Sequence, residues 1–244
     1  MAAHRARRAP PRTPTARRLR ALYDSLVERF GPQQWWPART ALEVVIGAYL
    51  TQNTAWKSVE RSLANLEARG LLSLDGLRSI PEADLRELIR PSGFMTRKTA
   101  ALKAWVAFLD AHYGGRIESL RKAAQRSSAS VRSQLLALPA VGPETADAIL
   151  LYALGVPAMV VDEYLRRIVT RHGLAPENAK YPEVQALAEQ AFAADLPRDR
   201  ARHYNEFHAL VVLAGKLHCG RVARCQGCPL RWDLPRSPPA DPSA

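Results

Sequence analysis

Apolar residues recur every three or four positions along most of the chain, and this spacing constrains the fold more than any other feature of the sequence. The pattern begins near Leu22 and continues to Leu217, and no stretch shows the sustained alternation of a half-buried strand. Residues 41–50 are apolar on nearly every side, as a buried central helix would be. The sequence therefore predicts an all-α fold of helices joined by short connections.

The chain is basic, with 35 Lys and Arg residues against 23 Asp and Glu residues and a formal net charge of +12. The first 20 residues hold seven arginines and no acidic residue, which predicts a disordered tail that either reaches nucleic acid or is simply solvated. An organelle transit peptide would have a similar composition. No segment is apolar enough for a membrane span or a secretion signal, which favours a cytoplasmic protein.

A short turn motif, Leu138-Pro139-Ala140-Val141-Gly142, separates two helical patterns. We expect Gly142 to adopt the positive φ of a tight turn and the following proline to begin the next helix. Backbone N–H groups at such a helix start suit a phosphate oxygen, so the motif predicts a helix-hairpin-helix that grips a DNA backbone. A plain connection between two helices is the alternative.

A carboxylate follows the hairpin at the start of a later helix, in the sequence Val160-Val161-Asp162. Asp is a good N-cap, so Asp162 has an ordinary structural explanation. A carboxylate is also the group that stabilises an oxocarbenium-like sugar when a glycosidic bond breaks. One residue can serve both purposes.

The order of these motifs carries a resemblance to a known family. The hairpin at 138–142, then Gly155-Val156-Pro157, then Val161-Asp162 resemble the signature of the endonuclease III superfamily of DNA glycosylases, over about residues 22–234. The resemblance implies the helix-hairpin-helix glycosylase fold, with two helical lobes flanking a DNA-binding cleft. It places Asp162 in the position of the family's catalytic aspartate.

The resemblance also implies domain limits and a DNA interface. Residues 38–155 would form a central helical domain with the hairpin, and 21–37 plus 156–234 a second lobe with a C-terminal cysteine loop, leaving 1–20 and 235–244 as disordered tails. The residues expected to contact double-stranded DNA are Leu138, Val141, Gly142 and Thr145. The protein would act as a monomer associated with the nucleoid.

The chain departs from the family at Glu144. In bifunctional members, the residue two places after the hairpin glycine is a lysine that attacks the sugar and supports strand cleavage through a Schiff base. A carboxylate cannot form an imine, so the resemblance implies a monofunctional glycosylase in which Glu144 belongs to the catalytic site. Alternatively, Glu144 only complements the helix dipole.

A second resemblance, in the runs at 50–57, 91–94, 143–147 and 160–162, is to the endonuclease III-related 3-methyladenine DNA glycosylases. It implies an aromatic base pocket made by Trp35, Trp36 and Trp56, with Lys216 at its side. Alkylated purines are electron-poor and stack well between indoles, which agrees with such a pocket. Core packing is the ordinary alternative for these tryptophans.

Base flipping requires side chains that fill the gap in the duplex. By the family match, Gln52 would enter the base stack from one side and Phe94 from the other, where an apolar wedge is useful. Arg97 and Lys98, just after the wedge, would contact phosphates or be solvated. Oxidised pyrimidines or mismatched bases remain alternative substrates, and a DNA-binding protein without catalysis remains an alternative function.

All three cysteines lie close together in the sequence, as Cys219, Cys225 and Cys228. Such clustering favours a metal centre over a disulfide. The family carries a [4Fe–4S] cluster on four cysteines, and the fourth would fall near Leu234, where this chain has none. Three thiolates with His218 or Asp233 could hold a cluster, three cysteines and a histidine could hold zinc, or the loop could be metal-free. The resemblance favours the cluster.

Overall fold

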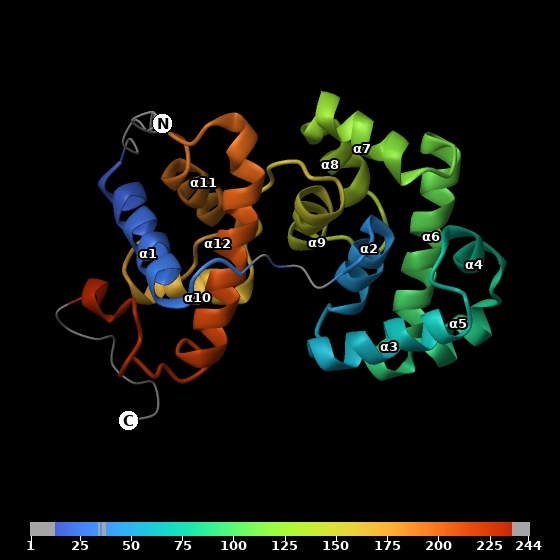
Figure 1. The fold of residues 1–244 in the computed structure, drawn as a ribbon, viewed down its shortest axis with the longest axis horizontal. Coiled ribbons are helices and arrows are strands. Elements are labelled where there is room, and N and C mark those ends of the chain that lie inside the picture. The colour runs from blue at the N-terminus through green and yellow to red at the C-terminus, as the bar shows by residue number, and fades with distance from the viewer. Residues whose placement is uncertain (1–12, 34, 36–37, 236–244) are drawn as a thin grey trace, which may run out of the picture. The chain divides into compact units, whose positions relative to one another are not determined.

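A computed structural model describes residues 13–33, 35 and 38–235, and these residues form helices without any β-strand (Figure 1). The predicted all-α class is thereby confirmed. None of the described helices is long and apolar enough to cross a membrane. The elements, in chain order, are α1 (Pro14–Phe30), α2 (Ala41–Leu50), α3 (Trp56–Ala68), α4 (Leu74–Ser79), α5 (Glu82–Leu88), η1 (Arg90–Ser92), α6 (Met95–Tyr113), α7 (Ile117–Arg126), α8 (Ser128–Leu136), α9 (Pro143–Ala148), η2 (Ile149–Ala153), α10 (Glu163–Arg171), α11 (Tyr181–Ala191), α12 (Pro197–Leu217) and η3 (Arg231–Asp233).

The helices divide into two compact units. Trp36–Ala158 form one unit, and Met1–Trp35 with Met159–Ala244 form the other. The resemblance implied limits at 37/38 and 155/156, whereas these units divide at 35/36 and 158/159. The first unit, called here the hairpin unit, contains α2 to η2, and the second, called the terminal unit, contains α1 and α10 to η3.

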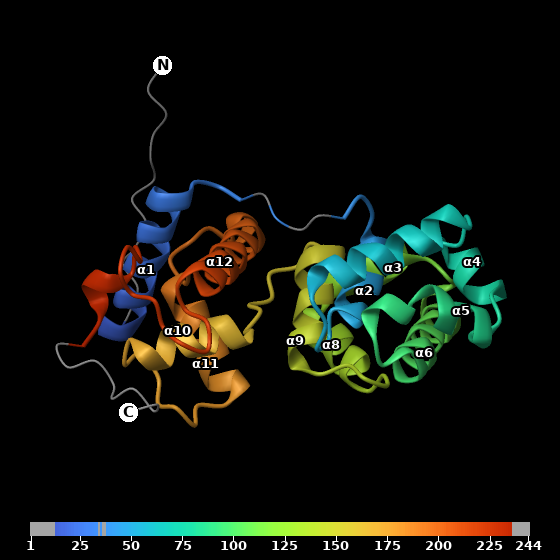
Figure 2. The same ribbon diagram turned by 90° about the horizontal axis from the view of Figure 1, so that it is seen from below.

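The terminal unit begins earlier than the sequence indicated. Thr13 caps α1 by accepting a hydrogen bond from the Ala16 backbone, so residues 14–20 of the expected disordered tail are helical. Two of the tail arginines are held by acids far away in the sequence, Arg18 by Asp233 and Arg20 by Asp195. In two views α1 lies with α10, α11 and α12 (Figure 2). Residues 1–12 and 236–244 of the predicted tails lie outside the described residues.

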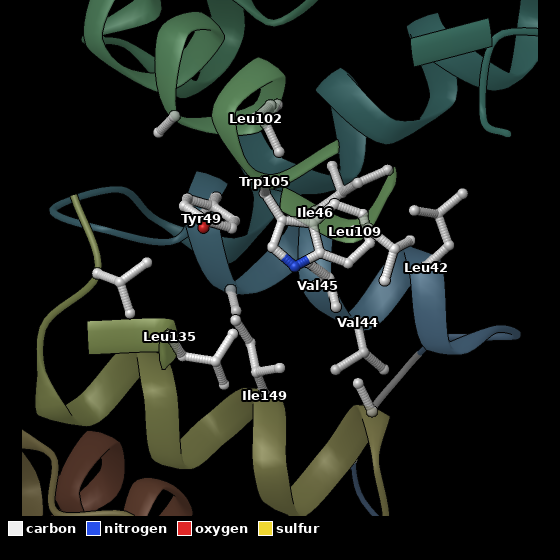
Figure 3. Close-up of a cluster of buried hydrophobic side chains, with 14 of the residues drawn as sticks. Leu42, Val44, Val45, Ile46, Tyr49, Leu102, Trp105, Leu109, Leu135 and Ile149 are labelled. Carbon is white, nitrogen blue, oxygen red and sulfur yellow. The ribbon is translucent and has the colours of Figure 1, made fainter. Parts of the chain in front are cut away.

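The hairpin unit is built around α2, and all but one of the ten residues of this helix are buried. Figure 3 shows α2 between α6 on one side and the helices of the hairpin on the other. Trp105 of α6 and Ile149 of η2, both completely buried, contribute to the same hydrophobic cluster. The uniformly apolar segment therefore forms the central helix that its composition predicted.

Candidate active site and DNA-binding hairpin

Asp162 occupies the N-cap of α10 in the terminal unit. Its Oδ1 accepts a hydrogen bond of 2.8 Å from the Leu165 backbone N–H, and the residue is only 7% exposed. The preceding Val160 and Val161 are buried and hold the entry to the helix in place. An aspartate at this position stabilises the helix N-terminus. The structural role that the sequence offered for Asp162 is therefore real, and it leaves the second oxygen, Oδ2, directed elsewhere.

Asp162 Oδ2 lies 3.7 Å from Nε2 of His208 on α12. His208 is buried, and the centroid of its ring lies 5.4 Å from that of Trp35. The Asp162 carboxylate, the His208 imidazole and the Trp35 indole come from three separate segments of the chain. Within the terminal unit they lie next to one another in that order. The analysis of the sequence did not select His208, because neither its spacing nor its neighbours distinguish it from an ordinary helical residue.

The segment that carries Trp35 is tied to α12. The backbone N–H of Gln33 donates to the Glu206 carboxylate, and the Gln33 side chain donates to the carbonyls of Phe30 and Gly31 at 3.0 and 3.1 Å. Glu206 stands two residues before His208 on the same helix. These bonds fix the chain just before Trp35 and so explain how its ring reaches His208.

Two other residues of the predicted base pocket, Lys216 and Trp56, are among the described residues. Lys216 is exposed in the last turn of α12, eight residues and about 12 Å along the helix from His208. Trp56 belongs to the hairpin unit, where it packs against the core and its Nε1 donates to Glu60 at 2.9 Å. Trp36 lies outside the described residues. Among the described pocket residues of the terminal unit, Trp35 lies against His208 of the Asp162 and His208 pair.

The hairpin at 138–142 joins α8 to α9, with a conformation that differs from the expected one. Gly142 is extended, with φ −96°, and caps α9, whereas Ala140 takes the positive φ of 61°. The expectation for Gly142 was therefore wrong, and the residue with the strained backbone is Ala140, two positions earlier. A Cβ on Gly142 would meet no atom within 4 Å, so the glycine leaves the surface beside the start of α9 open.

Gln52 explains how Ala140 holds this conformation. Its Nε2 donates to the Ala140 carbonyl at 2.8 Å and to Thr145 Oγ1 at 3.1 Å. A left-handed alanine costs about 1 kcal/mol, and a hydrogen bond of this kind offsets a cost of that size. The predicted wedge residue Gln52 and the predicted DNA-binding residue Thr145 are thus joined in the hairpin unit.

A buried ion pair braces the two helices of the hairpin. Arg132 of α8 donates to both carboxylate oxygens of Asp147 on α9, at 2.7 and 2.9 Å. Asp147 is completely buried, so the bidentate geometry compensates for removing its charge from water. Val141 and Thr145 are buried in the same region, Leu138 is half-buried, and Glu144 is exposed in the first turn of α9.

The three cysteines line one pocket in the terminal unit. His218 lines the same pocket, together with the apolar side chains of Ile168 on α10 and of Leu230 and Leu234 on either side of η3. Burial raises the pKa of the Cys228 thiol, and the nearby Cys225 and Cys219 raise it further. The Arg171 guanidinium donates to Cys219 Sγ at 3.1 Å. The three thiols therefore lie close to one another, and the Arg171 cation contacts one of them.

The fourth ligand that the sequence left open is narrowed by the structure. Asp233 is committed elsewhere, because both of its carboxylate oxygens accept from Arg18, at 2.9 and 3.0 Å, and one lies 3.2 Å from Nδ1 of His172. Among the described residues, no three His, Cys, Asp or Glu side chains are arranged to hold a single metal ion. Each ligand of a four-iron cluster binds its own iron atom, so a cluster does not require that arrangement. Of the two candidates for a fourth ligand, His218 lines the same pocket as the three cysteines, and Asp233 is paired with Arg18.

Comparison with known proteins agrees with this arrangement. Residues 46–194 match the family model described as HhH-GPD superfamily base excision DNA repair protein. The DNA repair glycosylase candidate MJ1434 of Methanocaldococcus jannaschii is 41% identical over 210 residues, which cover 86% of this chain and 92% of that protein. Endonuclease III-like protein 1 of Bos taurus is 29% identical over 87% of this chain and 66% of its own length.

Among solved structures, the 3-methyladenine DNA glycosylase of H. pylori bound to 1,N6-ethenoadenine aligns with a TM-score of 0.70 and 29% identity, over 83% of this chain and 97% of that chain. The sequence, the hairpin and the fold therefore agree with one another and with the resemblance to the endonuclease III superfamily. The chain belongs to the HhH-GPD superfamily of base excision DNA repair proteins and is a DNA glycosylase of that type.

Proposed function

We propose that this protein is a monofunctional glycosylase that releases alkylated purines such as 3-methyladenine, with Asp162 as its catalytic carboxylate. The observation that carries the proposal is the buried Asp162 beside His208, with the Trp35 indole against the same imidazole. The H. pylori relative adds support, because it is a 3-methyladenine DNA glycosylase whose structure contains 1,N6-ethenoadenine.

The reaction breaks the bond between the sugar C1′ and the purine nitrogen. The electron pair leaves with the base, and the positive charge that develops on the sugar is stabilised by the Asp162 carboxylate. Water then adds to C1′, and its proton passes to that carboxylate. An alkylated purine already carries positive charge, so it departs as a neutral base without an acid catalyst.

The absence of a lysine at position 144 supports hydrolysis without strand cleavage. A Schiff base requires an amine, and Glu144 at the start of α9 offers a carboxylate. Trp36, Trp56 and Lys216 remain predicted pocket residues. Gln52 and Phe94 remain predicted to enter the base stack, and Phe94 is 63% exposed on its loop, as a wedge requires.

We predict that end-labelled duplex DNA carrying methylated purines will break only after hot alkali once it has been treated with the protein. Base release leaves an alkali-sensitive abasic site, and a glycosylase without an amine nucleophile leaves the strand intact. Matched duplexes with an oxidised pyrimidine or a mismatched thymine serve as controls for lesion preference. Breaks without alkali would contradict the monofunctional assignment, and release from only the control duplexes would contradict the alkylpurine assignment.

We also propose that Cys219, Cys225 and Cys228, with His218, hold an iron–sulfur cluster that stabilises the C-terminal loop. Protein purified without oxygen should then contain about four irons per chain and absorb visible light, as a [4Fe–4S] cluster does. The Cys225→Ser variant should lose most of this iron, while Asp233→Asn should keep it because Asp233 pairs with Arg18. Zinc in place of iron, or no metal at all, would contradict the cluster.

A further inference from the structure

Lys98 is a buried lysine in the first turn of α6, only 3% exposed. Its Nζ donates to the carbonyls of Leu50 and Ser92 and to Thr54 Oγ1, each at 2.8 Å. These three bonds use every donor of the ammonium group. The expectation that Lys98 contacts phosphates or is solvated is therefore wrong for this structure.

The three acceptors of Lys98 belong to two loops that are far apart in the sequence. Leu50, the last residue of α2, and Thr54, in the loop before α3, stand on either side of Gln52. Ser92, the last residue of η1, stands two residues before Phe94, which precedes α6. The Thr54 hydroxyl completes the junction, because it lies 2.6 Å from the Ser92 carbonyl and 3.1 Å from that of Gln52. The ammonium thus joins the loops of both predicted wedge residues.

Both loops contain unfavourable backbone conformations. Asn53 and Phe94 have positive φ values of 51° and 47°, a region that costs a non-glycine residue about 1 kcal/mol or more. Such conformations persist only where the surroundings hold them. Burial lowers the pKa of Lys98 to about 8, with a further contribution from Arg97, so the site bears a desolvation cost to keep the ammonium there.

We propose that Lys98 is a positioning residue that holds the Gln52 and Phe94 loops as one preformed unit for insertion into the DNA base stack. The proposal rests on the proposed wedge role of these two residues. Because Gln52 also bonds to the hairpin, the same network links both loops to the predicted backbone grip. Separating the loops would require each to be ordered during base flipping, which weakens insertion more than general DNA binding.

Lys103 provides a matched control on the same helix. Its Nζ also donates to three oxygens, the carbonyls of Leu77, Arg78 and Ile80, but these belong to the end of α4, where no wedge residue is predicted. Lys98→Met and Lys103→Met therefore remove the same chemistry from two different loops. Thr54→Val is a milder change in the Lys98 network, since it removes the hydroxyl that contacts Lys98 and the Ser92 carbonyl and keeps the side-chain shape.

The test measures the fluorescence of 2-aminopurine in duplex DNA, which rises when insertion unstacks that base. We expect Lys98→Met to lower the rise at saturating protein by at least about threefold, Thr54→Val to lower it less, and Lys103→Met to match the wild type. A 2-aminopurine that stands opposite an abasic site has no pairing partner to lose. On such a duplex, the difference in fluorescence rise between Lys98→Met and the wild type should be smaller. This readout needs no base release, so it is independent of the alkylpurine assignment.

A wild-type rise in Lys98→Met, or a loss equally large in Lys103→Met, would overturn the positioning role. Binding by the wild type without any rise would overturn it as well, because no wedge would then enter the stack. If Lys98→Met does not fold by circular dichroism, the comparison between Thr54→Val and Lys103→Met decides in the same way.

Discussion

Asp162→Asn should reduce the rate of base release by at least about 100-fold while leaving the fold intact. The loss follows because the neutral amide no longer stabilises the charge that develops on the sugar. The fold survives because Asn is as good an N-cap as Asp, and its oxygen can still accept the hydrogen bond from Leu165. Single-turnover release from a methylated duplex measures the rate, and thermal unfolding measures the stability.

Glu163→Gln is the matched control, because it removes a carboxylate from the adjacent residue, whose side chain is 65% exposed and paired with Arg167. This variant should release bases at close to the wild-type rate. Binding of Asp162→Asn to a duplex with an abasic site should be at least as tight as that of the wild type, since one negative charge is gone. Unchanged release by Asp162→Asn would leave Asp162 as a cap only and would remove the basis of the enzymatic proposal.

The fold class could be predicted from the sequence because helical periodicity is a local property. The hairpin position could be predicted for the same reason, since the Leu-Pro-x-Val-Gly pattern lies within five residues. The residue that bears the positive φ could not, because Ala140 is held by Gln52, 88 positions earlier in the chain. Local propensity favours glycine at a position with positive φ. Here alanine occupies it, stabilised by the hydrogen bond from Gln52.

The same distinction applies to the candidate site. Asp162 could be selected through the resemblance of the ordered motifs to the family signature, whereas His208 becomes relevant only when α12 packs against α10. Helix α1 extends into the predicted tail because Arg18 finds Asp233, 215 positions away. The sequence predicted an exposed charge at Lys98, but the side chain is buried where it bonds to Leu50, Thr54 and Ser92. Each of these errors concerns a polar side chain whose partner is distant in the sequence.

The packing of α10 against α12 also predicts a sensitive glycine. A Cβ on Gly215 of α12 would lie 2.1 Å from Cδ1, 2.4 Å from Cγ and 2.7 Å from Cβ of Tyr164 on α10. A rotation of the tyrosine ring can relieve the first two contacts but not the last, because the Tyr164 Cβ is fixed to the backbone. The two helices must therefore separate to accept any larger residue.

Gly215→Ala should destabilise the protein by about 2 kcal/mol and lower Tm by about 4–8 °C. Alanine improves the intrinsic helix propensity by at most about 1 kcal/mol, so overpacking outweighs it. Base release should fall too, because Tyr164 is two residues from Asp162 and moves with the start of α10. Gly220→Ala is the control, since its Cβ would meet only the Val222 carbonyl oxygen at 3.7 Å, an ordinary contact. Thermal unfolding of both variants decides the matter: equal Tm values would show that α10 and α12 accommodate the methyl group without separating.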